Sequence, residues 1–162
     1  MSRPCLTAIF LILTALSACA QAGAAQPPAD GLHKTHYPGG QVQEEKNYKA
    51  GRLDGPYKAY YENGAVRQEV TYSAGKITGM ARKYHTNGKL DVEASYRDGV
   101  KHGPHKAYSA QGSLLQDANY KMGQLDGTLM YYDDKTGTVL AEVGYRNGNK
   151  HGRERFYVPS GT

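Results

Sequence analysis

The chain has 162 residues, with 20 Lys and Arg against 15 Asp and Glu, a formal net charge of +5, 20 glycines, 14 tyrosines and no tryptophan. Much of its 39% of hydrophobic residues lies in the first 20 positions, so the remainder is too polar for a thick globular core, yet too rich in tyrosine for a disordered chain. Basic and acidic residues are interspersed, and the sequence has no block of basic residues and no pattern of a DNA-recognition helix, which argues against nucleic-acid binding.

Residues 1–18 have the pattern of an export signal. Arg3 precedes an apolar run from Cys5 to Ala18, which is shorter than the roughly 20 residues of a membrane-spanning helix and fits a secretory signal. The segment ends in Leu16-Ser17-Ala18-Cys19 and resembles the signal of bacterial lipoproteins, whose cysteine accepts diacylglycerol. The resemblance implies a lipid anchor on Cys19. The alternative is an ordinary secretory signal that leaves this thiol free.

Residues 19–30 are predicted to be the lipidated cysteine and a flexible tether. They are small, polar or proline and show no period. A tether of this length holds the following domain roughly 20 Å from the lipid. Because Ala20 replaces the aspartate of retained inner-membrane lipoproteins, the resemblance favours the periplasmic face of the outer membrane.

Residues 31–162 are built on an internal repeat, which is the first feature to seek in a sequence of this kind. A lead glycine recurs at intervals of 24 residues, with 25 for the last interval. The six units start at Gly31, Gly55, Gly79, Gly103, Gly127 and Gly152. An aromatic residue or histidine stands five positions after each lead glycine, at His36, Tyr60, Tyr84, Tyr108, Tyr132 and Tyr157.

The second half of each unit holds three further columns. The aliphatic column is Val42, Val66, Leu90, Leu114 and Val139. The acidic column is Glu45, Glu69, Glu93, Asp117 and Glu142. The tyrosine column is Tyr48, Tyr72, Tyr96, Tyr120 and Tyr145.

This pattern predicts a β-hairpin in every unit. The dipeptides Asn63-Gly64 and Asn87-Gly88 favour tight turns because both residues tolerate positive φ. The aliphatic and tyrosine columns are six residues apart and are therefore expected on one face of the second strand, with the acidic column on the other. Five units and one further strand give about eleven strands and a length of roughly 50 Å. Arg153, Glu154 and Arg155 are expected to discourage pairing with another chain at the last strand.

The columns resemble the MORN repeat, and more closely its bacterial variant form. The stretch from Tyr48 to Tyr72 carries the whole pattern, and the resemblance covers residues 31–161. It implies an all-β, elongated, single-layer twisted antiparallel sheet of tandem β-hairpin repeats. It also implies a binding or scaffolding role toward phospholipid or protein, and some bacterial members are classed as antitoxins.

A basic column follows each lead glycine by three positions, with Met130 as the exception. It forms a candidate binding stripe for an anionic surface, made of Lys34, Lys58, Arg82, Lys106 and Arg155. The structural alternative is cross-strand pairing with the acidic column, which contributes about 0.2–1 kcal/mol per pair.

No catalytic residue, metal site or cofactor site is predicted. His102 and His105 are close in sequence, but two imidazoles without a carboxylate or thiol are a poor metal site. Known catalytic motifs are missing, and adjacent carboxylates on a strand point to opposite faces. The sequence therefore predicts a non-enzymatic envelope lipoprotein whose array binds an envelope protein or an anionic surface. An immunity-type protein that neutralises a toxin is the alternative, and the sequence does not define the oligomeric state.

Overall fold

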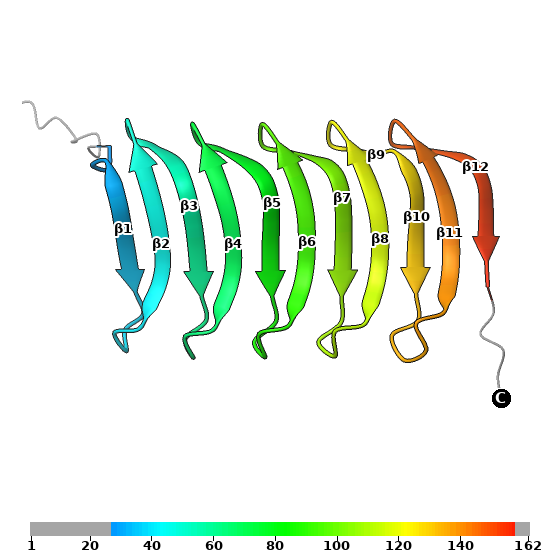
Figure 1. Ribbon diagram of the computed structural model, residues 1–162, viewed down its shortest axis with the longest axis horizontal. Coiled ribbons are helices and arrows are strands. Elements are labelled where there is room, and N and C mark those ends of the chain that lie inside the picture. Colours follow the sequence, from blue (N-terminus) through cyan, green and yellow to red (C-terminus); the bar gives the residue numbers. More distant parts are fainter. Residues whose placement is uncertain (1–26, 158–162) are drawn as a thin grey trace, which may run out of the picture.

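The computed structural model describes residues 27–157, so the signal segment, Cys19 and Gly161 lie outside the described residues. The described chain forms one antiparallel sheet whose strands follow one another in chain order (Figure 1). The strands are β1 (Gly31–His36), β2 (Val42–Lys49), β3 (Arg52–Tyr60), β4 (Val66–Ser73), β5 (Lys76–Tyr84), β6 (Leu90–Arg97), β7 (Val100–Tyr108), β8 (Leu114–Lys121), β9 (Gln124–Leu125), β10 (Gly127–Tyr132), β11 (Val139–Arg146) and β12 (Asn149–Phe156). The predicted all-β sheet of tandem hairpins is confirmed.

Two of the twelve strands are parts of one repeat strand. β9 and β10 both pair with β8 and are separated by Asp126, whose backbone N–H donates to the carbonyl of Asn119 at 2.9 Å. Counted as one, they give the eleven strands that the repeat predicts. Within residues 27–157, no helix has the length and hydropathy needed to cross a membrane.

A β-bulge lies beside the hairpin loop in each of the five complete units. In the second unit Ala59 pairs with Gln68, whereas Tyr60 pairs with Val66, so Arg67 is the extra residue. Directly paired residues share a face, and Val66 accordingly lines a hollow together with Glu69 and Tyr84. The prediction that the aliphatic column shares a face with the tyrosine column is therefore wrong, because the bulge reverses the alternation between the two positions.

The two kinds of turn in the repeat have different geometries. The hairpin loops, at the bottom of Figure 1, each have one positive-φ residue, such as Gly64 at +82°. The first four are the three-residue loop with a glycine bulge, and the fifth, between Asp133 and Thr138, is one residue longer. The inter-unit turns, at the top, have two. Their residue pairs are Ala50-Gly51, Ala74-Gly75, Asp98-Gly99, Met122-Gly123 and Asn147-Gly148. The positive φ predicted for Asn63 and Asn87 is wrong, and the fully left-handed pairs lie in the other set of turns.

Among the described residues, four of the seven buried hydrophobic residues form a column that the sequence analysis did not identify. It immediately follows the acidic column and includes Val70, Ala94, Ala118 and Val143, with Ala118 only 1% exposed. The tyrosine column two residues later is half-buried. Each tyrosine lies directly opposite the lead glycine of its unit, as Tyr72 does opposite Gly55. Its ring packs edge-on against a neighbouring ring in three units, as in the pair Tyr57 and Tyr72 with centroids 5.9 Å apart.

Both ends of the strands are tied from unit to unit. At the hairpin loops, the Tyr61 hydroxyl donates to the carbonyl of Tyr84 at 2.6 Å. At the inter-unit turns, the Gly99 N–H donates to the carbonyl of Ile77 at 2.9 Å. These bonds add to the strand ladders, so neighbouring units are held along their whole width.

Candidate interaction surfaces

The basic and acidic columns form one row across the sheet. In the first four units the basic residue of the column faces the acidic residue of the same unit, and Arg155 faces Glu142 of the preceding unit. The register also sets Glu69 opposite Arg82 of the next unit. Positive and negative side chains therefore alternate from strand to strand, and we call this row the charge ladder. The distances between opposite charges are 2.8 Å for Lys34–Glu45, 2.9 Å for Lys58–Glu69, 3.8 Å for Arg82–Glu93, 3.9 Å for Lys106–Asp117 and 3.1 Å for Arg155–Glu142.

All five residues of the candidate binding stripe lie in the charge ladder, and each has a carboxylate partner. Cross-strand pairing, the structural alternative, is thus the arrangement that the molecule adopts. The row carries five basic and five acidic residues, which leaves little net attraction for a distant anion. Met130 interrupts the ladder between Asp117 and Glu142.

The ladder carboxylates also bind tyrosines of the next unit. The hydroxyls of Tyr60, Tyr84 and Tyr108 donate to Glu45, Glu69 and Glu93 at 3.0, 3.0 and 3.2 Å. The aromatic column is therefore a connector between units. Tyr132 differs, because its hydroxyl contacts the sulfur of Met130 at 3.4 Å.

These contacts move the pKa values of the groups that share them. Hydrogen bonding to Lys58, with a smaller contribution from Tyr84, holds the pKa of Glu69 below its ordinary value. The same contact with Glu69 raises the pKa of Lys58. Burial, followed by the bond to Glu69, raises the pKa of Tyr84. Lys58 and Glu69 thus keep their charges over a wider range of pH than they would alone.

A second group of basic residues lies along the inter-unit turns, and the sequence analysis missed it. We call this edge of the sheet the turn edge. Its basic residues are exposed and have no ion-pair partner among residues 27–157. They are Lys49, Arg52, Lys76, Arg97, Lys121 and Arg146. The sequence does contain a pattern that indicates it, since a basic residue directly follows the tyrosine of the tyrosine column in four of five units.

The carboxylates of the turn edge are mostly engaged by the backbone. Asp30, Asp54 and Asp126 accept hydrogen bonds from the N–H groups of the left-handed residues Ala50, Ala74 and Asn147, at 2.7, 2.9 and 3.2 Å. In the fourth turn His102 takes this role toward Met122 at 3.4 Å. Thr78 occupies the equivalent position for the third turn, whose left-handed residue is Asp98.

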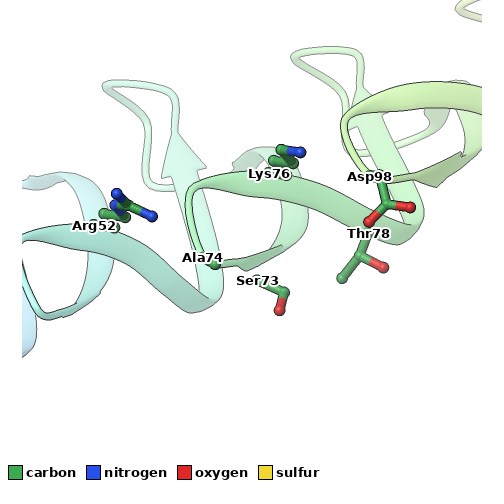
Figure 2. Close-up of a pocket in the computed structure, with 6 residues that line it drawn as sticks. All are labelled: Arg52, Ser73, Ala74, Lys76, Thr78 and Asp98. Carbon is green, nitrogen blue, oxygen red and sulfur yellow. The ribbon is translucent and has the colours of Figure 1, made fainter.

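Two hollows lie between successive inter-unit turns. One of about 380 Å³ is lined by Lys49, Arg52 and Asp54 with the two alanines of the turns. The other, of about 350 Å³, is lined by Arg52, Ser73, Ala74, Lys76, Thr78 and Asp98. Figure 2 shows that the side chains of the second hollow come from three consecutive turns. Two cationic groups and two hydroxyls in one hollow can bind an oxyanion such as phosphate.

The two histidines considered as metal ligands have separate roles. His102 caps a turn, whereas His105 packs against Tyr120 with ring centroids 5.6 Å apart. Burial, followed by the charge of Lys101, lowers the pKa of His105. No group of three metal-ligating side chains occurs in the part of the chain that the structure describes.

The repeated hairpins, the continuous sheet and the ties between units define a tandem β-hairpin repeat protein. The family model described as "MORN repeat variant" matches residues 29–50, 53–74, 77–98 and 101–122, which together exceed half of the chain. The chain belongs to this MORN repeat variant family. Its fifth hairpin and β12 continue the same sheet beyond the matched residues. No match was found among curated proteins.

Proposed function

We propose that this protein is a non-enzymatic interaction scaffold of the bacterial envelope, anchored by lipid at Cys19 to the periplasmic face of the outer membrane. Membership in the MORN repeat family supports a repeat-based interaction scaffold. The Leu16-Ser17-Ala18-Cys19 sequence supports the anchor. The partner is an envelope protein or an anionic surface.

The observation that carries the scaffold proposal is the bonding between units. Adjacent units share a strand ladder, a tyrosine–carboxylate bond such as Tyr84–Glu69, and bonds at both kinds of turn. A repeat array bonded in this way is stiff along its length and presents the same groups at regular intervals. An extended surface of this kind suits the binding of a large partner.

Lipidation is tested by mass spectrometry of the chain purified from bacterial membranes. The expected N-terminus is an acylated Cys19. The matched control is Cys19→Ser, which removes the acceptor thiol and should release the protein from the membrane fraction. An intact Met1 on the mature chain, or an unmodified Cys19, would refute the anchor.

The scaffold role is tested by cross-linking the full chain in intact cells and identifying what it binds. An envelope protein or lipid is the expected result. A toxin as the captured partner would replace the scaffold by the immunity-type alternative. Hydrolytic activity of the purified protein would overturn the non-enzymatic role.

A further inference from the structure

We propose that the turn edge lies on an anionic lipid surface, so that the sheet stands edge-on to the membrane. This inference rests on the proposed lipid anchor for its orientation. It assigns the membrane contact to the inter-unit turns and leaves both faces of the sheet free for a partner.

The first observation is the distribution of unpaired charge. The six basic side chains of the turn edge are exposed and unpaired within the described residues. They recur along the sheet as the turns do, and turns of successive units are about 10 Å apart, the spacing of two strands. Long basic side chains in a row match a plane of phosphate groups better than a single compact ligand.

The second observation concerns the acidic residues of the same edge. Asp30, Asp54 and Asp126 are folded back onto turn N–H groups, and Asp98 is part of the third turn itself. Three of these carboxylates are therefore occupied by the turn backbone, whereas the basic side chains of the turn edge are exposed and make no ion pair among the described residues. A flat anionic surface that approaches this edge meets six cations that are not already paired.

The third observation is where the chain enters the sheet. β1 begins at the turn edge, and Asp30, which precedes it, is bonded to the first inter-unit turn. β12 ends at the opposite edge, beside the hairpin loops (Figure 1). A short connection from Cys19 to Gly31 thus reaches the sheet at the basic edge, and anchoring brings that edge toward the lipid.

The hollow in Figure 2 supplies a place for one headgroup. Arg52 and Lys76 offer positive charge, and Ser73 and Thr78 offer hydroxyl donors around a volume of about 350 Å³. Thr78 stands where other units place an aspartate or histidine, so Asp98 is the one carboxylate among the residues that line this hollow. A lipid phosphate is the chemistry that these groups recognise.

The rest of the surface is less suited to an anionic membrane. The charge ladder is balanced by its own ion pairs. The hairpin-loop edge has Glu62, Asp133 and Asp134 against Lys89 and Lys135. The turn edge is therefore the basic side of the described sheet.

The test uses the full chain with Cys5→Ala and Cys19→Ser, which cannot be acylated, synthesised in vitro and offered to vesicles. The vesicles contain phosphatidylcholine alone or mixed with phosphatidylglycerol. The edge variant adds Lys49→Gln, Arg97→Gln, Lys121→Gln and Arg146→Gln. The matched control variant removes four exposed cations elsewhere, with Lys83→Gln, Lys89→Gln, Lys135→Gln and Arg153→Gln.

The parent chain is expected to prefer the anionic vesicles, and this preference should fall as salt is raised. The edge variant should lose at least about tenfold of the preference, since each basic residue near the lipid contributes to binding. The control variant should keep most of it. Equal losses in the two variants, or no preference in the parent chain, would overturn the inference.

A fluorescent label tests the orientation directly. An environment-sensitive dye on Met122→Cys, at the turn edge, should shift its emission on anionic vesicles, whereas a dye on Gln111→Cys, in a hairpin loop, should not. The opposite result would overturn the edge-on orientation. Because these chains have no acyl acceptor, failure here is distinct from failure of lipidation, which mass spectrometry measures separately.

Discussion

The Tyr84 hydroxyl donates a 3.0 Å hydrogen bond to the carboxylate of Glu69, although the two residues belong to different repeat units. Glu69 also pairs with Lys58 of its own unit at 2.9 Å. One carboxylate therefore joins three strands, because Lys58 lies on β3, Glu69 on β4 and Tyr84 on β5. Glu45 is bonded in the same way. The side-chain contacts between units are therefore ordinary ion pairs and hydrogen bonds.

The substitution Tyr84→Phe should lower the free energy of unfolding by about 1 kcal/mol, because it removes the bond to Glu69 and leaves the ring in place. Denaturant unfolding measures the change. Tyr132→Phe is the matched control, since that hydroxyl contacts only a methionine sulfur, a weak acceptor. A control loss as large as that of Tyr84→Phe would show that the carboxylate bond does not stabilise the array.

Stability should be greatest in the pH range between the acidic and tyrosine titrations. Ion pairs and tyrosine hydroxyls lower the pKa values of Glu45 and Glu69 from 4.5, so the folded state binds fewer protons than the unfolded chain just below that pH. This contribution is fully present above about pH 4.5 and is lost as the pH falls through the lowered folded-state pKa values. Thermal unfolding across the acidic range measures the loss, and Glu45→Gln with Glu69→Gln should reduce it.

At alkaline pH the pKa shift that matters is upward, and it belongs to a tyrosine. Burial, followed by the bond to Glu44, raises the pKa of Tyr57 from 10.0 to about 12. The unfolded chain loses this proton first, so the contribution is present below pH 10.0 and is lost as the pH rises toward 12. Tyr57→Phe should weaken the alkaline dependence of stability. An unchanged profile would contradict the assignment.

Left-handed residues in the inter-unit turns give a prediction of increased stability. Met122 has φ of +50° and is 66% exposed, and a residue of this kind is strained in that conformation, which asparagine tolerates. Met122→Asn should therefore raise the free energy of unfolding by about 0.5–1 kcal/mol. Asn147 has the same φ of +50°, and Asn147→Ala should lower stability by a similar amount. Denaturant unfolding of both variants is the measurement, and changes of the same sign would contradict the prediction.

The repeat length, the strand number and the positions of the turns could be predicted from the sequence, because glycine and tyrosine recur where the backbone reverses and where rings pack. The opposite faces of the acidic and tyrosine columns could also be predicted, because no bulge separates Glu69 from Tyr72 where β4 pairs with β3. The face of the aliphatic column could not, since no residue type marks the bulge at Arg67. The buried column was hidden because its first member is Lys46 and the others are alanine or valine. The turn edge was missed because basic residues beside glycine turns are usual on any solvated surface.

The buried column itself supplies the last prediction. Val70 on β4 is 4% exposed and lies directly opposite Tyr57 on β3, so Val70→Ala removes two methyl groups from a packed site. A loss of about 2 kcal/mol is expected. Val100 is 40% exposed, and Val100→Ala should cost less than about 0.5 kcal/mol, as is usual for a surface position. Denaturant unfolding compares the two, and similar losses would show that this column is not the core of the sheet.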